Sequence, residues 1–189
     1  MIMEFVEPIR DKKQIDNMKR YLKERNLRDW LLFVLGINNG LRISDLLSLQ
    51  IADVKDCDRI TIREKKTGKA KDFPLSDNCK KALSEYMKVT GLTVGPLFPS
   101  RKITGCRGTG AISRQQAYTA INAAARAVGI KVAIGTHTLR KTFGYWAFQQ
   151  GVNVTIIQQL LNHSAPSVTL RYIGITKDEL DQVYIKLNL

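Results

Sequence analysis

The sequence predicts an α+β fold that is mostly helical and contains one small antiparallel sheet. Two observations lead to this class. Apolar side chains recur at helical spacing along several stretches of the 189-residue chain, as in amphipathic or buried helices. Alternating side chains instead flank a glycine-containing turn at residues 65–68, as in a β-hairpin. The chain has no series of strands that alternate with helices, which excludes a βαβ fold.

Helices are predicted before the hairpin. Asp11–Asn26 carries apolar side chains about one turn apart, with Lys and Arg between them, which indicates an amphipathic helix. Leu27–Asn38 is apolar on nearly all sides and is expected to be a buried central helix. The turn signal Asn38-Asn39-Gly40 ends it. Ile43–Leu49 is predicted to form a further short helix.

The hairpin is predicted from two alternating segments, Arg59–Arg63 and Lys71–Leu75, on either side of Lys65-Lys66-Thr67-Gly68. Gly95–Phe98 is expected to add a short third strand. Arg101–Gly110 contains three Gly, two Arg and a Lys, and it is expected to be a mobile basic loop.

The remaining helices are predicted from capping residues that precede helical runs. They are Ser76 to about Lys88, Ser113 to about Val128, Thr136–Gly151, Asn153–Leu161, and a final helix that begins at Thr176. The final helix opens with a capping box, in which Glu179 follows Thr176 by three residues.

The charge balance indicates a polyanionic partner. Thirty Lys and Arg residues oppose 17 Asp and Glu residues, so the formal net charge is +13. Self-repulsion of this size destabilises a compact domain, and nucleic acid is the usual partner of such a surface. The alternative is a ribosomal or merely basic surface.

Several classes of protein are excluded by composition. The longest apolar run, Trp30–Ile37, is far shorter than the roughly 20 residues of a membrane span. The first ten residues lack a signal-peptide core, so a cytoplasmic location is predicted. The three cysteines form no Cys-x-x-Cys pair, and the two histidines, His137 and His163, lack metal-ligand spacing. Neither a metal nor another cofactor is expected.

A set of six side chains could act together on a phosphate. His137 and Arg140 share a helix face near a helix N-terminus, an arrangement that can hold a phosphate. The complete set is Arg42, Lys66, His137, Arg140, His163 and Tyr172. Each member alone has an ordinary structural interpretation. Together they supply cations, hydrogen-bond donors and a nucleophile without a carboxylate pair or a P-loop, which favours metal-independent phosphoryl transfer.

Five segments that contain these residues occur in a characteristic order. They are Gly40-Leu41-Arg42-Ile43-Ser44-Asp45-Leu46, Lys65-Lys66-Thr67-Gly68-Lys69, Thr136-His137-Thr138-Leu139-Arg140-Lys141-Thr142, Leu160-Leu161-Asn162-His163-Ser164 and Thr169-Leu170-Arg171-Tyr172-Ile173. In type, order and spacing they resemble the catalytic domain of the tyrosine recombinase (phage integrase) family. The resemblance covers the chain from residue 42 to residue 172.

The resemblance implies that the protein cleaves and rejoins DNA strands, as in site-specific recombination or DNA integration. Tyr172 would attack a scissile phosphate and form a 3′-phosphotyrosyl intermediate with release of a 5′-hydroxyl. Arg42 and Arg140 would bind the non-bridging oxygens and stabilise the developing charge. His163 would donate to the same oxygens.

The resemblance also implies two proton-transfer roles. His137 would assist proton transfer from the nucleophile, and Lys66 would protonate the leaving oxygen. Lys65 and Lys69 are close enough to replace Lys66, which is preferred because it lies eight residues before Pro74. Asp45 is expected to orient Arg42 or a histidine, or to make a structural pair.

The chain departs from the family pattern in two respects. Asn162 precedes the second histidine, where members often have Gly. A separate core-binding domain is also expected to be missing, because only about 40 residues precede Arg42. Residues 1–175 are therefore predicted to form the catalytic domain. Residues 176–189 are predicted to form a C-terminal helix whose apolar stripe either packs on its own domain or docks on a neighbouring protomer. Docking would give a homo-oligomer on double-stranded DNA.

Further DNA contacts are predicted only as a class. The candidates are Arg101, Lys102, Ser113, Arg114, Gln115 and Tyr118, although each could equally be solvated surface. Two alternative functions remain at this point. One is a non-catalytic DNA-binding regulatory module that retains the fold, and the other is a type IB topoisomerase-like relaxase.

Overall fold

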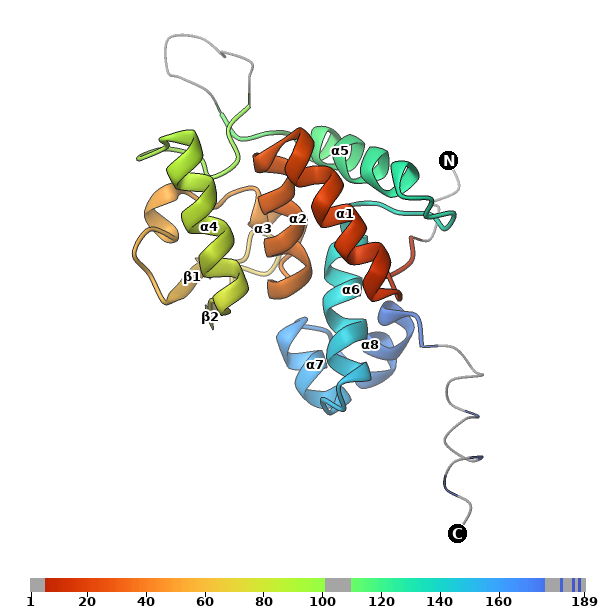
Figure 1. Ribbon diagram of the computed structural model, residues 1–189. Helices are drawn as coiled ribbons and strands as arrows, with labels where there is room; N and C mark the ends of the chain where they lie inside the picture. The colour runs from red at the N-terminus through yellow and green to blue at the C-terminus, as the bar shows by residue number, and fades with distance from the viewer. Residues whose placement is uncertain (1–5, 101–109, 176–180, 182–184, 186, 188–189) are drawn as a thin grey trace.

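The computed structural model describes residues 6–100 and 110–175, together with Asp181, Ile185 and Leu187. The predicted α+β fold is confirmed: the described residues are mostly helical, and a single two-stranded antiparallel sheet lies at one edge of the helical body (Figure 1). The strands are β1 (Arg59–Arg63) and β2 (Ala70–Pro74). The helices are α1 (Lys12–Arg25), α2 (Leu27–Asn39), α3 (Ile43–Leu46), α4 (Asp77–Thr90), α5 (Arg114–Ala127), α6 (Thr136–Gln149), α7 (Val154–Leu160) and α8 (Pro166–Ile173), with a 3-10 turn, η1, at Ile51–Asp53.

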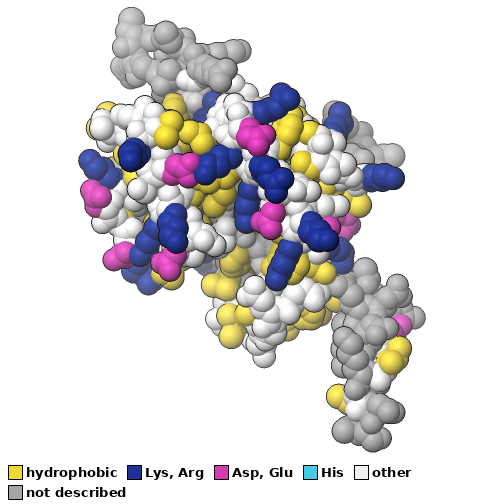
Figure 2. Space-filling view, in the orientation of Figure 1, with side chains coloured by type: hydrophobic (Ala, Val, Ile, Leu, Met, Phe, Trp, Pro, Cys, Tyr) yellow, Lys and Arg dark blue, Asp and Glu magenta, His cyan; other side chains and the backbone are white. Residues whose placement is uncertain are grey.

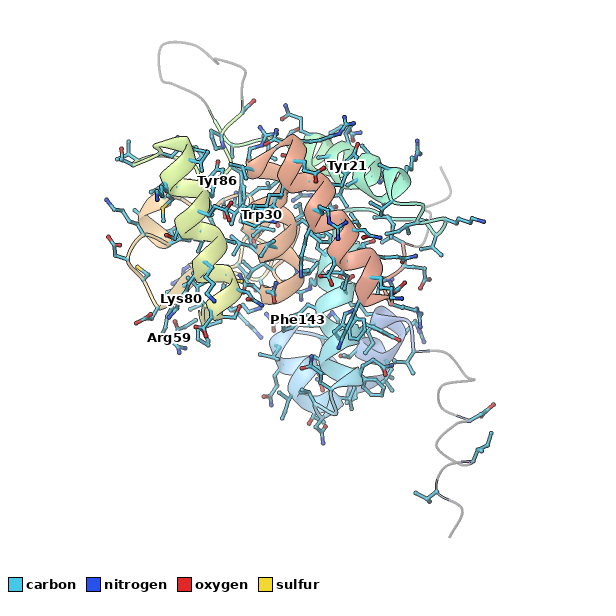
Figure 3. The ribbon with its side chains drawn as sticks, viewed as in Figure 1. Tyr21, Trp30, Arg59, Lys80, Tyr86 and Phe143 are labelled. Atoms are coloured by element: carbon cyan, nitrogen blue, oxygen red, sulfur yellow. The ribbon has the colours of Figure 1, made fainter. Side chains whose placement is uncertain are left out.

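Local signals determine where the first helices begin and end. The side chain of Asp11 accepts a hydrogen bond from the backbone of Lys13 and caps α1. Asn26 ends α1 and caps α2 through Arg28. Gly40 ends α2 in the left-handed conformation, with φ of 58°. A Cβ atom at Gly40 would also collide with the ring of Phe143, labelled in Figure 3, so glycine is required there for two reasons.

Helix α2 is the centre of the main hydrophobic core. Its residues Leu31, Leu32, Phe33 and Leu35 are completely buried, as expected for a helix that is apolar on nearly all sides. Helices α1, α4 and α6 pack around it. The polar side chains of α1 and α4 form the face in Figure 2, where acidic groups are interspersed among Lys and Arg.

A second, smaller hydrophobic cluster forms at the far end of α6. It consists of Tyr145, Ile157, Leu161 and Ile173 and joins the second half of α6 to α7 and α8. We call α7, α8 and the second half of α6 the C-terminal lobe; it projects below the main body in Figure 1. Gly144 permits this packing, because a Cβ there would lie 2.6 Å from Ile173 Cγ2.

The hairpin pairs Arg59 with Pro74 and Arg63 with Ala70. One further backbone hydrogen bond, from Glu64 N to Lys69 O at 2.9 Å, extends the pairing, so Lys65–Gly68 forms the turn. Only the buried Ile60 and the partly buried side chains beside it face the core. The opposite face is charged, with Arg59, labelled in Figure 3, paired to Asp72.

Some predicted elements differ from the structure. The third strand expected at Gly95–Phe98 is wrong: Pro96 makes an isolated bridge to Gln50 and is not part of the sheet. The helix expected from Ile43 to Leu49 ends at Leu46. Gly135, not Thr136, is the N-cap of α6, and its N–H donates to Thr138 Oγ1 at 3.1 Å.

Other predictions fall outside the described residues. They include the basic loop over 101–109 and most of the segment 176–189, so docking of that segment on another protomer stays a prediction. The side chains of Ile185 and Leu187, which are described, are 67% and 60% exposed. No helix in the described part of the chain is both long and apolar enough to span a membrane. Nor do three His, Cys, Asp or Glu side chains gather there in a possible metal site.

Candidate active site

Four of the six predicted residues come together between the main body and the C-terminal lobe. Arg42 caps α3, Arg140 lies in α6, His163 follows α7 and Tyr172 lies in α8. The charges of both arginines act on the tyrosine and on the histidine. These side chains thus share one site although they come from separate elements.

Arg140 is almost fully buried, with 3% of its surface exposed. Its Nη1 donates to the carbonyl of Gly40 at 2.6 Å, and its Nη2 donates to the carbonyl of Leu161. The first acceptor lies at the end of α2, two residues before Arg42, and the second lies two residues before His163. Arg140 therefore connects the two backbone segments that carry the other phosphate-binding candidates.

Arg42 pairs with a carboxylate that the sequence did not single out. Its Nη1 lies 2.7 Å from Oε1 of Glu64, whose side chain is 1% exposed. Glu64 also accepts hydrogen bonds from Thr67 Oγ1 at 2.7 Å and Asn162 Nδ2 at 2.8 Å. Burial alone would raise the pKa of Glu64, but these hydrogen bonds and the Arg42 guanidinium together lower it to about 2.

The ring of Tyr172 packs against His163 in an edge-to-face arrangement, with ring centroids 4.8 Å apart. Nδ1 of His163 is engaged by Thr169 Oγ1 at 3.1 Å, which leaves Nε2 for a ligand. Burial, followed by the charges of Arg140 and Arg42, lowers the pKa of His163 to about 4. Burial raises the pKa of Tyr172, although both arginines oppose the shift. Tyr172 is therefore a neutral phenol beside a neutral imidazole at neutral pH.

His137 occupies the first turn of α6 and is exposed to solvent. Desolvation by the surrounding protein lowers its pKa, and the cations Arg140, Lys141, Arg114 and Lys66 lower it further. His137 is thus uncharged at neutral pH and can accept a proton. Among the hairpin lysines, Lys66 is the one whose charge reaches this histidine.

The hairpin turn contains three exposed lysines, Lys65, Lys66 and Lys69. The backbone N–H of Lys65 donates to Asp45 Oδ1 at 3.0 Å, so Asp45 holds the turn. The Asp45 side chain also accepts from Ser44 Oγ at 3.4 Å, whereas the guanidinium of Arg42 pairs with Glu64. The Asp45 side chain thus contacts the backbone of the lysine turn, and its role in orienting Arg42 or a histidine stays a prediction.

Two other lysines near the site were not predicted. Nζ of Lys71 donates to the carbonyl of Leu160 at 2.9 Å, and burial, followed by the charge of Arg140, lowers its pKa to about 8. Nζ of Lys141 lies 5.3 Å from the centre of the Tyr172 ring. Neither belongs to a distinctive local pattern; Lys141 stands beside Arg140 in the sequence, which was the one available signal.

The predicted DNA contacts at the start of α5 lie near this site. Arg114, Gln115 and Tyr118 are exposed, and the charge of Arg114 reaches His137. Ser113 caps the helix, since its Oγ accepts from the backbone of Gln116 at 3.2 Å. The Ser113 oxygen therefore accepts within the helix cap, and its O–H proton can still donate to a phosphate. Arg101 and Lys102 lie outside the described residues.

The arrangement is suited to stabilising an anion. The charges of two guanidinium groups act on the Tyr172 phenol, and the His163 ring packs against it. Arg140 is held by the carbonyls of Gly40 and Leu161, and Arg42 is paired with Glu64, before any ligand binds. Preorganised donors of this kind favour a transition state in which negative charge develops on phosphate oxygens.

Comparison with known proteins gives consistent matches. The model of the phage integrase family matches residues 10–179. The protein "Probable integrase/recombinase YoeC" of Bacillus subtilis (strain 168) is 43% identical over 182 residues, which cover 96% of this chain and 97% of YoeC. The crystal structure of XerA recombinase has a TM-score of 0.79 at 21% identity, over 97% of this chain and 65% of that chain.

A further match is the XerH site-specific recombinase bound to palindromic difH substrate in a post-cleavage complex. Its TM-score is 0.71 at 18% identity, over 92% of this chain and 51% of that chain. The chain also spans about half the length of curated XerC and XerD recombinases, for example 52% of XerD from Corynebacterium glutamicum. These structural matches establish the likeness of fold.

Proposed function

Because this chain belongs to the phage integrase family, we propose that it cleaves and rejoins DNA strands in site-specific recombination. The observation that carries the proposal is the convergence of Arg42, Arg140 and His163 on Tyr172 between the main body and the C-terminal lobe. Its direct test is covalent capture of DNA on Tyr172, described at the end of the Discussion.

In the proposed reaction the Tyr172 oxygen attacks the scissile phosphorus. A tyrosyl O–P bond forms and the bond from phosphorus to the 5′-oxygen breaks. The tyrosine proton passes to His137, which the lowered pKa leaves able to accept it. Lys66 gives a proton to the departing 5′-oxygen. Rejoining is the reverse, with a 5′-hydroxyl as the nucleophile, and the protein supplies every group by its own side chains.

The phosphate is proposed to lie between the two arginines. A guanidinium has five N–H groups, so Arg140 and Arg42 keep further donors for non-bridging oxygens beyond those directed at Gly40, Leu161 and Glu64. His163 would add a neutral donor through Nε2 in the tautomer whose Nδ1 accepts from Thr169 Oγ1, and its pKa of about 4 keeps the ring uncharged at neutral pH. A binding module without activity has no need of a nucleophile within this set, which argues against the non-catalytic alternative.

The role of Lys66 is tested by changing the leaving group. Lys66→Ala is expected to cleave ordinary DNA slowly, by about 10²-fold, but to cleave DNA with a 5′-bridging sulfur at nearly the wild-type rate. A thiolate leaves without a proton, so loss of a general acid has little effect. Single-turnover adduct formation on both substrates provides the measurement.

Lys65→Ala and Lys69→Ala are the matched controls, since both lysines lie in the same exposed turn. They are expected to cleave both substrates at similar rates to the wild type. If the sulfur substrate instead rescues a slow Lys65→Ala or Lys69→Ala variant, the general acid is the lysine that was replaced in that variant, and not Lys66.

The proposed DNA partner predicts a steep dependence of affinity on salt. Each neutralised phosphate contributes about −0.9 to the slope of log K against log salt concentration. Arg114→Ala is expected to reduce the magnitude of this slope by about 1 if Arg114 contacts a phosphate. Fluorescence anisotropy of labelled duplex DNA between low and physiological salt measures it.

Arg126→Ala is the control for that measurement, because Arg126 is also exposed but lies in the last turn of α5. It is expected to leave the slope unchanged. A wild-type affinity that does not change with salt would contradict nucleic acid as the partner of the +13 charge.

A further inference from the structure

Glu64 is a buried carboxylate that pairs with Arg42, one of the cations of the site, whereas the other buried carboxylate there, Asp45, holds the lysine turn. The side chain of Glu64 is 1% exposed and lies at the end of β1, directly before the lysine turn. A negative charge beside the proposed phosphate position repels the substrate, so its presence requires a compensating role. The proposed reaction assigns it none.

The two carboxylate oxygens of Glu64 have different contacts: Oε1 makes an ion pair without hydrogen-bond geometry, and Oε2 accepts two hydrogen bonds. Oε1 lies 2.7 Å from Arg42 Nη1, whereas Oε2 accepts from Thr67 and Asn162. The carboxylate therefore joins three parts of the site: the segment before α3, the lysine turn and the residue that precedes His163. With a pKa of about 2 it stays ionised at neutral pH and has no proton to give.

The backbone conformation of Asn162 allows its side chain to reach Glu64. Its φ is +50°, in the left-handed region that Asn tolerates better than most non-glycine residues. In this conformation the chain turns after the end of α7, and the side-chain amide of Asn162 donates to Glu64. A glycine would adopt the same backbone but would lack the hydrogen bond.

We propose that Glu64 is a positioning residue that fixes the Arg42 guanidinium, and that Asn162 ties this ion pair to the segment that carries His163. The inference rests on the proposed function, because it concerns how the arginine meets the scissile phosphate. Without Glu64 the long Arg42 side chain gains rotational freedom, and that freedom must be lost again in the transition state.

The network also couples two parts of the molecule. Glu64 belongs to the hairpin of the main body, while Asn162 belongs to the C-terminal lobe. Their hydrogen bond forms only when the lobe is seated against the hairpin. The orientation of Arg42 is consequently linked to the placement of the lobe that carries Tyr172.

The test compares Glu64→Gln with Asn162→Gly in single-turnover adduct formation on nicked duplex DNA. Glu64→Gln keeps the size of the side chain but removes its charge, and it is expected to lower the cleavage rate by about tenfold or more. DNA affinity is expected to be unchanged or slightly tighter, because the charge removed repels phosphate. Asn162→Gly is expected to lower the rate by about threefold without backbone strain.

Asp72→Asn is the matched control. Asp72 lies on the same hairpin and loses the same charge, but it is exposed and paired with Arg59. It is expected to cleave at the wild-type rate. Thermal unfolding of each variant verifies that the rates compare folded proteins.

A double-mutant cycle separates positioning from a general structural role. If Glu64 acts through Arg42, the tenfold loss from Glu64→Gln disappears when the change is made in an Arg42→Ala background. A structural role would instead lower the rate by the same factor in both backgrounds, and that result would overturn the inference.

The possible failures are distinguishable. If the wild-type protein forms no adduct, the proposed function fails. If the wild type cleaves and Glu64→Gln cleaves within twofold of it, only the positioning role fails. If Glu64→Gln does not fold, the double-mutant cycle with Arg42→Ala is made with Asn162→Gly instead. An Asn162→Gly cleavage rate within about 1.5-fold of the wild-type rate then overturns the inference.

Discussion

Replacing Tyr172 with Phe is expected to abolish the covalent protein–DNA adduct while folding and DNA affinity remain. The substitution removes one oxygen, which is the proposed nucleophile. The ring keeps its edge-to-face contact with His163 and its place beneath Lys141. Denaturing gel electrophoresis of labelled nicked DNA measures the adduct, and anisotropy measures the affinity.

Tyr145→Phe is the control for this variant. Tyr145 lies in the same C-terminal lobe and packs against Trp146, so its loss of a hydroxyl tests for an indirect effect on the lobe. It is expected to form the adduct at the wild-type rate. Adduct formation by Tyr172→Phe at an undiminished rate would mean that another residue attacks the DNA.

Arg140→Ala is expected to lower the cleavage rate by about 10²-fold or more, by analogy with loss of one oxyanion donor. The same change should also destabilise the protein, because it leaves the buried carbonyls of Gly40 and Leu161 without their donor. The rate must therefore be measured below the melting temperature of the variant and expressed per folded molecule.

Arg140→Lys helps to separate the two effects, since it restores a charge but not the paired N–H groups that reach both carbonyls. We expect it to recover only part of the rate. Arg25→Ala, at an exposed arginine in the last turn of α1, is the control and should have no effect. A loss of less than about threefold for Arg140→Ala would remove this residue from the proposed mechanism.

The sequence predicted those parts of the fold that depend on local signals. The helix predicted over Asp11–Asn26, the break at Asn38-Asn39-Gly40 and the hairpin turn are determined by a few neighbouring residues. The third strand expected at Gly95–Phe98 failed because pairing of Pro96 depends on where Gln50 lies, 46 residues earlier. Proline also cannot donate the hydrogen bonds of a continuous ladder.

The predicted site residues were found through ordered motifs, and their catalytic roles stay predictions. Glu64 was missed for a physical reason: nothing in the sequence near it distinguishes a buried carboxylate from a solvated one. Its partners Arg42 and Asn162 lie 22 and 98 residues away and meet it only in the folded chain. The same holds for Lys71, whose lowered pKa follows from burial against the end of α7.

The most direct measurement is identification of the residue that becomes bonded to DNA. The wild-type protein is incubated with a pool of nicked duplexes that carry randomised sequence around the nick, and covalent complexes are isolated under denaturing conditions. After nuclease and trypsin digestion, mass spectrometry is expected to find a nucleotide phosphate on the peptide that begins at Tyr172, since trypsin cleaves after Arg171. A nucleotide attached to any other residue, or the absence of an adduct from every duplex in the pool, would contradict cleavage by Tyr172.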